Sequence, residues 1–228
     1  MTIEREKKLS RLSDLNLKIT NPGYLHYKSL FANLHSAISR FAKGRLIDIG
    51  CGNKPYTEWV NKVCTEYIGV DIIQSDRNMV DIICDATQIT LPDASFDTVL
   101  SSQAIEHIAE HGKVINEAFR LLKPGGYFIV SAPMYWPLHE EPYDYFRFTK
   151  HGFKFLLENT GFEVKEIKSC GGKWSLFGQT VIFTVPEILS RFRIVRYVHN
   201  KFFAWLDNKF YNDINTMSYV VVGLKPAH

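Results

Sequence analysis

The sequence predicts an α/β protein with a doubly wound, mostly parallel sheet, and two observations carry this prediction. The apolar residues 46–49 are bracketed by Gly44 and Gly50 and lead into a glycine turn and a helix start. This is the order of a buried parallel strand followed by its crossover helix. The next strand ends at Asp71, 21 residues beyond Gly50. An acid about 20 residues past the glycines is where a doubly wound fold places the ribose of its ligand.

Composition indicates a single globular domain. The chain has 228 residues, of which 46% are hydrophobic and 22% charged, enough for a sizeable core. Its net charge of +3 is too small to indicate a nucleic-acid partner. Residues 1–8 lack the apolar stretch of a signal peptide, and no run reaches the ~18 apolar residues of a membrane span. Four cysteines without a C-x-x-C pair indicate reduced thiols in a cytoplasmic protein: Cys51, Cys64, Cys84 and Cys170.

Turn signals and apolar periodicity place the elements in order. Residues 1–43 are expected to form an N-terminal helical lid, with a helix over 24–43 that Gly44 ends. Three of its side chains, His26, Tyr27 and His35, either face a substrate or belong to the edge of the core. Further helices are expected at 55–63, 110–122 and 150–159, and strands at 45–49, 66–72, 80–84, within 91–100, at 127–132, at 162–167 and at 218–224. Thr149 and Gly161 suit the two ends of the 150–159 helix.

The glycine turn distinguishes two classes of cofactor. In the dinucleotide pattern G-x-G-x-x-G a third glycine packs helix against strand, and Pro55 occupies that place here. Pro55 therefore argues against a nicotinamide-dependent oxidoreductase. The run Asp-Ile-Gly-Cys-Gly at 48–52 instead resembles motif I of the class I S-adenosylmethionine-dependent methyltransferases. Lys54 stands where that motif often has its third glycine.

Later segments extend this resemblance over residues 44–133, the expected cofactor-binding core. Asp85 followed by Ala86 is similar to the adenine-binding pair of the family, and Leu-Leu-Lys-Pro-Gly-Gly at 121–126 resembles one of its signatures. Residues 91–100 resemble the ubiquinone-biosynthesis type. An Asn/Asp-Pro-Pro-Tyr segment is absent from 101–108, which argues against nucleic-acid or protein amide substrates. The resemblance implies S-adenosylmethionine as cofactor and a Rossmann-like doubly wound sheet of seven strands, mostly parallel with an antiparallel last strand. The cofactor-binding residues it implies are Asp48, Gly50, Cys51, Gly52, Asp71, Ile72, Asp85, Ala86 and Gln103.

The segment 133–149 follows the fifth strand, at the edge where doubly wound folds bind ligands. Its aromatic, acidic, histidine and arginine side chains can stack on a substrate and position a proton acceptor; alternatively, its acids and Arg147 form ordinary ion pairs. His-Glu-Glu-Pro-Tyr-Asp-Tyr-Phe-Arg at 139–147 resembles methyltransferases of bacterial surface-glycan biosynthesis. No metal-ligand spacing is visible, so we expect metal-independent transfer. The candidate catalytic bases are His107, His139, Glu140 and Asp144.

The substrate-side half, 134–228, contains a helical insertion at about 173–212. Residues 184–187 resemble a capping box, and apolar residues recur at helical spacing over 186–210, with five basic residues against two acidic ones. Such a helix can cover the active site, form a homodimer contact, or lie peripherally on the inner face of an anionic membrane.

These observations predict a methyltransferase that methylates a hydroxyl of a small molecule or a sugar or glycan. Two alternatives stay open: N-methylation of a small amine, and a non-catalytic scaffold that binds S-adenosylmethionine. The acceptor is not specified by the sequence.

Overall fold

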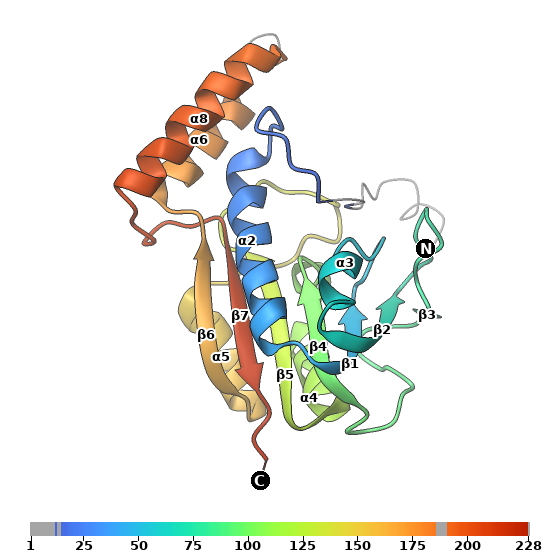
Figure 1. Ribbon diagram of the computed structural model, residues 1–228. Helices are drawn as coiled ribbons and strands as arrows, with labels where there is room; N and C mark the ends of the chain where they lie inside the picture. Colours follow the sequence, from blue (N-terminus) through green and yellow to red (C-terminus); the bar gives the residue numbers. More distant parts are fainter. Residues whose placement is uncertain (1–11, 13–14, 186–190, 228) are drawn as a thin grey trace.

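The computed structural model describes residues 12, 15–185 and 191–227. One sheet lies between two layers of helices, and a pair of helices projects beyond it (Figure 1). The strands are β1 (Gly44–Ile49), β2 (Cys64–Asp71), β3 (Ile82–Ile83), β4 (Phe96–Ser102), β5 (Leu122–Pro133), β6 (Glu163–Cys170) and β7 (Ser218–Leu224). The helices are α2 (Tyr24–Phe41), α3 (Thr57–Val60), α4 (His111–Leu121), α5 (Lys150–Thr160), α6 (Lys173–Thr184) and α8 (Arg193–Lys209), with a 3-10 turn, η1, at Ile105–His107.

The strand order is β3-β2-β1-β4-β5-β7-β6. Pairing is parallel from β3 through β5, whereas β7 runs antiparallel to both β5 and β6. This confirms the predicted seven-stranded, mostly parallel sheet with an antiparallel last strand. The carboxyl ends of β1, β2, β4 and β5 therefore lie along one edge of the sheet, where open α/β sheets bind ligands.

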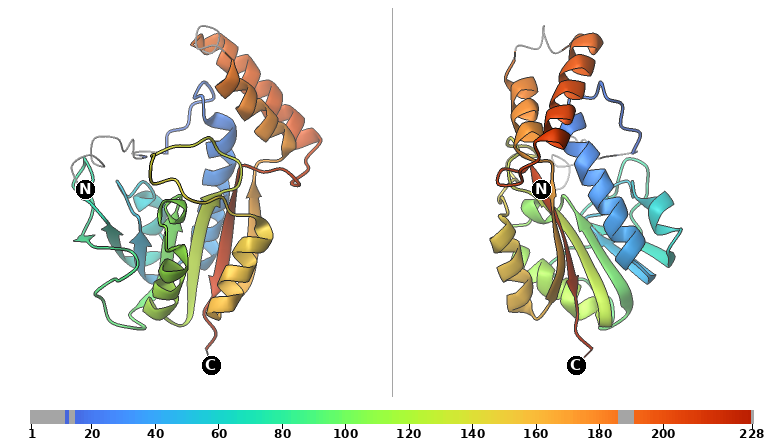
Figure 2. Two further views of the ribbon diagram at one scale, coloured as in Figure 1. Left: turned by 180° about the vertical axis from the view of Figure 1, so that it is seen from behind. Right: turned by 60° about the vertical axis from the view of Figure 1, so that its left-hand side comes forward.

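Alternation along the strands gives the sheet two apolar faces. Leu46 of β1 packs into a cluster with Leu34 of α2, while its neighbour Ile47 packs into a second cluster with Val114 of α4 and Phe153 of α5. Figure 2 shows α2 and α3 covering one face and α4 and α5 the other. The helix expected as a lid is thus mostly one layer of the sandwich.

Several elements are shorter or longer than the sequence predicts. The helix expected at 55–63 is reduced to the four residues of α3, and the strand expected at 80–84 to the two residues of β3. The Pro-Gly-Gly cluster expected to break the chain lies inside β5, which begins directly after α4. Pairing tolerates it because the register of β4 against β5 shifts there, between Phe96 and Thr98.

The caps of α5 form as predicted. The Thr149 hydroxyl accepts a hydrogen bond from the Gly152 N–H at 3.0 Å, and Gly161 follows the helix with φ +106°. This left-handed conformation strongly favours glycine.

All four cysteines are free thiols, as expected.

In its described residues the expected helical insertion contains the helices α6 and α8. We call α6 and α8 together the α6–α8 hairpin; it projects beyond the carboxyl edge of the sheet (Figure 2). Thr184, expected to cap the start of a helix, is the last residue of α6, and the rest of that expected capping box, 186–187, lies outside the described residues. Among residues 12, 15–185 and 191–227, no helix has both the length and the apolar character needed to cross a membrane.

Candidate functional site

A cavity of about 540 Å³ opens at the carboxyl edge of the sheet. Its floor and one wall come from the turn after β1, the end of β2 and the segment after β3. We call these surfaces the cofactor wall. The nine residues expected to bind a cofactor all line this cavity: Asp48, Gly50, Cys51, Gly52, Asp71, Ile72, Asp85, Ala86 and Gln103. Residues spread over 56 positions of sequence thus meet around one space.

The turn after β1 requires glycine for conformation and for space. Gly50 has φ +78°, and a Cβ built on it would lie 2.4 Å from the Cβ of Ala104. The N–H groups of Gly50 and Cys51 both donate to the Val70 carbonyl, at 2.9 and 3.1 Å. These bonds attach the turn to β2, so its shape does not depend on a ligand.

Lys54, the departure from the family motif, keeps the same backbone. It has φ +48°, a left-handed conformation that is uncommon for residues other than glycine. Its ammonium group pairs with the Asp81 carboxylate and donates to the Tyr67 carbonyl at 3.2 Å. A Cβ on Gly69 would lie 2.4 Å from Lys54 Cε. The lysine is thus accommodated because β2 has a glycine beside it.

Two carboxylates of the cofactor wall are oriented by nearby donors. Asp71 Oδ2 accepts from the Gly52 N–H at 3.1 Å, and its Oδ1 accepts from the Ile72 N–H at 2.8 Å. Asp85 Oδ1 accepts from the Thr87 N–H at 2.8 Å and the Thr87 hydroxyl at 2.7 Å, and the backbone bond in particular lowers the pKa of Asp85. Both groups can therefore act as oriented hydrogen-bond acceptors, the chemistry that ribose hydroxyls and an adenine amino group need.

Asp48 lies deeper, with 2% of its surface exposed. The Tyr67 hydroxyl donates to its Oδ2 at 2.6 Å. Burial raises the pKa of Asp48 to about 7, which outweighs the opposing effect of the tyrosine bond. A positive charge placed beside Asp48 would favour its ionised form.

A second wall of the cavity comes from the loops after β4 and β5. We call it the acceptor wall. Three of the four candidate bases, His107, His139 and Glu140, line it. The two imidazole rings lie edge to face with centroids 4.7 Å apart, and His107 Nε2 is 3.8 Å from Glu140 Oε2. The structure thus joins residues that are 32 positions apart in the sequence.

Asp144, the fourth candidate base, does not line the cavity. Its side chain is 1% exposed and makes two 2.6 Å bonds to the Arg147 guanidinium, and its Oδ2 also accepts from the His139 N–H at 3.0 Å. Burial alone would raise its pKa, but the Arg147 bonds outweigh this and hold the pKa at about 2. Asp144 therefore forms an ordinary ion pair with Arg147, which was the alternative interpretation of this segment. This geometry favours a structural role for Asp144 over proton transfer.

Glu106 is the residue that the sequence analysis passed over. It is fully buried directly behind His107, and neither carboxyl oxygen has a hydrogen-bond partner among the described residues. Burial raises its pKa to about 8. The sequence does not reveal that Glu106 is buried, because the burial of an acid in a short loop depends on tertiary packing.

Aromatic side chains complete the acceptor wall. The first turns of α2 contribute His26 and Tyr27, whereas His35 packs on Trp59 instead, with ring centroids 5.0 Å apart. Burial lowers the pKa of His26 to about 3, and its Nε2 is hydrogen-bonded to the Ser218 hydroxyl at 2.8 Å. His26 is thus neutral at physiological pH. The loop after β5 adds Trp136, Tyr143 and Tyr145.

Comparison with known proteins identifies part of the chain. Residues 47–130 match the family described as methyltransferase domain. A probable S-adenosylmethionine-dependent methyltransferase of Mycolicibacterium smegmatis is 31% identical over 141 residues, 56% of this chain and 55% of that protein. The ubiquinone biosynthesis O-methyltransferase of Bradyrhizobium diazoefficiens is 31% identical over 98 residues, 38% of this chain and 39% of that protein. The matches thus cover about half or less of these relatives.

A solved structure agrees with the fold. A SAM-dependent methyltransferase from Archaeoglobus fulgidus superposes with a TM-score of 0.59 at 22% identity, covering 87% of this chain and 94% of that one. Residues 47–130 are thus similar to the predicted family, one relative of which is named as S-adenosylmethionine-dependent, and the solved structure agrees with the predicted fold.

Proposed function

We propose that this chain, whose residues 47–130 match the methyltransferase domain family, is a class I S-adenosylmethionine-dependent methyltransferase that methylates a hydroxyl group of a small molecule or a glycan. One observation carries the proposal. The cavity that contains the cofactor motif continues, without a break in its lining, into a wall of imidazole, carboxyl and aromatic side chains. A donor and an acceptor can therefore occupy one space.

The cofactor wall fits the donor. Bound S-adenosylmethionine supplies an electrophilic methyl group. Asp71 and Asp85 offer oriented carboxylates, and the glycine turn leaves the space that a Cβ on Gly50 would fill. Holding the methyl donor and the acceptor in line lowers a large part of the activation barrier of methyl transfer.

The acceptor wall fits a hydroxyl. A hydroxyl must lose its proton as its oxygen bonds to the methyl carbon, so a base beside the acceptor assists. The His107 Nδ1 lies 3.0 Å from the Tyr143 carbonyl, which can only accept. The proton is therefore on Nδ1, and Nε2 carries the lone pair that can receive the acceptor proton.

The aromatic side chains support a flat or sugar-like acceptor. Trp136, Tyr143 and Tyr145 line the cavity, and such rings stack on planar and sugar surfaces. N-methylation of a small amine is the alternative reaction, and a scaffold that binds the cofactor without turnover is the alternative function.

An acceptor screen tests the proposal. The protein would be incubated with S-adenosylmethionine and a panel of phenols, sugars and small amines, and S-adenosylhomocysteine would be measured by mass spectrometry. We expect turnover with a hydroxyl acceptor, and a fall of about 100-fold in His107→Gln but none in His151→Gln, an exposed histidine on α5. Turnover with amines alone would support N-methylation; cofactor binding without any product would support the scaffold.

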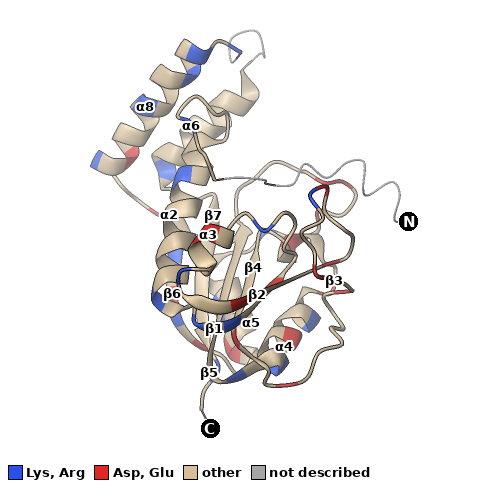
Figure 3. Cartoon of the chain, turned by 45° about the vertical axis from the view of Figure 1, so that its right-hand side comes forward, with Lys and Arg blue, Asp and Glu red and all other residues tan. Residues whose placement is uncertain are grey.

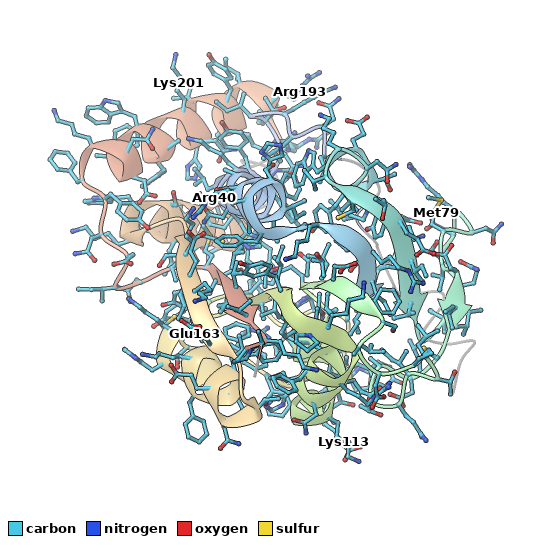
Figure 4. All side chains as sticks on the ribbon, turned by 60° about the horizontal axis from the view of Figure 1, so that its bottom comes forward. Arg40, Met79, Lys113, Glu163, Arg193 and Lys201 are labelled. Atoms are coloured by element: carbon cyan, nitrogen blue, oxygen red, sulfur yellow. The ribbon has the colours of Figure 1, made fainter. Side chains whose placement is uncertain are left out.

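The α6–α8 hairpin is proposed as the surface that contacts a membrane. Figure 3 shows basic residues along α8, and Figure 4 places Arg193 and Lys201 at its outer edge. The same helix carries exposed apolar side chains, among them Val198, Phe202 and Trp205, at 58, 50 and 51% exposure. A basic, aromatic face suits an anionic lipid surface, which a cytoplasmic protein would meet at the inner face of the membrane.

Vesicle binding distinguishes this contact from self-association. We expect co-sedimentation with anionic but not zwitterionic vesicles, weakened in the double variant Phe202→Ser/Trp205→Ser. A dimer in size-exclusion chromatography that the same variant dissociates, without vesicle binding, would assign the surface to a second copy instead.

A further inference from the structure

The acceptor wall contains a group of side chains with metal-ligating atoms. Glu106, His107 and His139 each offer one such atom, and these atoms all lie within 4.8 Å of one another. The first two residues belong to η1 after β4, and the third to the loop after β5. A bond from the Tyr145 N–H to the Glu106 carbonyl, at 3.0 Å, joins the two segments. The group is therefore a consequence of the fold rather than of flexible side chains that meet by chance.

Glu106 is the unusual member. Its carboxyl group is fully buried, and neither oxygen has a hydrogen-bond partner among the described residues. Burying a polar group without a partner is unfavourable, and burying a charged one is more so. Its Oε1 lies 3.9 Å from His107 Nε2, too far for a hydrogen bond. The His107 ring therefore does not form a hydrogen bond with the Glu106 carboxyl group.

Both imidazoles are oriented as metal ligands usually are. His107 Nδ1 lies 3.0 Å from the Tyr143 carbonyl, and His139 Nδ1 lies 3.2 Å from both Asp144 Oδ2 and the Pro137 carbonyl. These partners can only accept, so each Nδ1 carries a proton and each Nε2 carries a lone pair. A carboxylate or carbonyl behind a histidine fixes metal-binding imidazoles in this way.

The surrounding charge also favours a cation. Two further carboxylates flank the group, because Glu140 Oε2 lies 3.8 Å from His107 Nε2 and Asp144 Oδ2 lies 3.2 Å from His139 Nδ1, and the nearby cation is Arg147. That guanidinium is already paired with Asp144 in two bonds of 2.6 Å. The acceptor wall is thus rich in negative charge and poor in positive charge.

We propose that Glu106, His107 and His139 bind a divalent transition-metal ion, with zinc as the ion they fit best. Two imidazole nitrogens and one carboxylate are a donor set for zinc and similar ions, whereas magnesium prefers oxygen ligands throughout. Ligands about 2.1 Å from zinc lie about 3.4 Å apart, so the group needs only a modest contraction. Glu140 Oε2 lies 3.8 Å from His107 Nε2, so a further carboxylate flanks the group.

This inference changes the expected chemistry of the acceptor wall. The sequence predicted metal-independent transfer, because its metal-ligand residues are split between 106–107 and 139. With an ion present, the imidazoles would be ligands rather than bases. A hydroxyl bound to the ion would lose its proton more easily. Only this last step rests on the proposed methyl transfer; binding of the ion does not.

Metal titration tests the site directly. The purified full chain, stripped with a chelator, would be dialysed against zinc chloride, and bound zinc would be measured by mass spectrometry of the elements. Binding of S-adenosylmethionine would be measured on the same samples. We expect one zinc per chain, and an affinity lowered about 100-fold or more in His139→Ala and in Glu106→Gln, because loss of an outer partner alone costs about 10–100-fold.

Control variants distinguish ligation at this group from zinc binding elsewhere and from loss of folding. His151→Ala and Glu158→Gln remove an exposed histidine and an exposed acid on α5, far from the acceptor wall in sequence, and should bind zinc as the unaltered chain does. Glu106→Gln preserves the shape of the side chain, so loss of zinc with unchanged thermal stability would support ligation. Less than one zinc per chain, or one that the variants of Glu106 and His139 do not affect, would overturn the proposal. Either outcome leaves cofactor binding as a separate test of the proposed function.

Discussion

The two walls of the cavity differ in how their polar groups are satisfied. On the cofactor wall each carboxylate has its own donors: Tyr67 for Asp48, and backbone N–H groups for Asp71. On the acceptor wall Glu106 has no hydrogen-bond partner within the described part of the chain, and two imidazoles crowd against it. The carboxylates of the cofactor wall thus have hydrogen-bond donors within the protein, whereas the buried carboxyl group of Glu106 on the acceptor wall does not have one among the described residues.

This difference in hydrogen bonding predicts different behaviour of the two walls when a ligand binds. A site whose groups already hold one another can bind a ligand without reorganising, which favours affinity. A site with an unsatisfied buried acid stores a cost that a ligand, ion or proton can remove. Variants on each wall should therefore have separable effects.

The largest effect is expected at the turn after β1. In Gly50→Val the side chain would overlap Ala104 and force a valine to φ +78°. Binding of S-adenosylmethionine should fall by about 100-fold or more, or about 3 kcal/mol, as measured by calorimetry. Gly112→Val, where a Cβ meets nothing within 4 Å, is the control. Unchanged affinity in Gly50→Val would place the cofactor elsewhere.

A smaller loss is expected at the end of β2. Asp71→Ala removes one charged acceptor, which should weaken cofactor binding by about 1–3 kcal/mol and leave zinc binding unaltered. Asp76→Ala changes an exposed acid of the following loop and should bind the cofactor normally. If Asp71→Ala kept full affinity, Asp71 would not be the ribose partner.

The α6–α8 hairpin should be separable from both walls. Asp207 is 6% exposed and accepts from the Gly172 N–H at 2.9 Å and from the Ser175 hydroxyl at 2.7 Å, so it holds the start of α6 against α8. Asp207→Ala should lower the free energy of unfolding by about 1–3 kcal/mol in urea denaturation. Cofactor affinity should not change; a matching fall would show that the hairpin completes the cavity.

The smallest effect concerns pH. Burial raises the folded-state pKa of Asp48 from 3.8 to about 7, so its contribution to stability is fully present below about pH 4 and is lost as the pH rises through 7. Asp48→Asn removes this titration. Between pH 5 and 8 the unaltered chain should lose about 1 kcal/mol more stability than the variant, because the open cavity moderates the burial penalty. Parallel pH profiles would contradict the raised pKa.

The two walls also differ in how far the sequence predicts them. The cofactor wall depends on short, continuous segments, such as 48–52 and Asp85–Ala86, whose backbone roles follow from glycine and acid spacing. The sequence also predicted seven strands with an antiparallel last one, whereas their order in the sheet comes from the structure. The acceptor wall depends on the approach of 106–107 to 139–140, which no local pattern encodes.

Particular residues show where sequence reasoning ends. Glu106 is buried and its carboxyl oxygens have no hydrogen-bond partner among the described residues, and only the packing of η1 reveals this. Asp144 carries the same kind of group as Glu140, yet Arg147 three residues later pairs with it and takes it out of the cavity lining. The apolar pattern over 186–210 predicted a helix but not the partner helix α6, because the polar and apolar residues of α6 do not recur with a clear helical period.

Native mass spectrometry of the purified chain tests the central claim most directly. Equal concentrations of S-adenosylmethionine and NAD would be added together, since the fold alone suits either and Pro55 argues for the first. We expect a one-to-one adduct with S-adenosylmethionine that S-adenosylhomocysteine displaces, and none with NAD. A stoichiometric NAD adduct without S-adenosylmethionine would contradict this expectation.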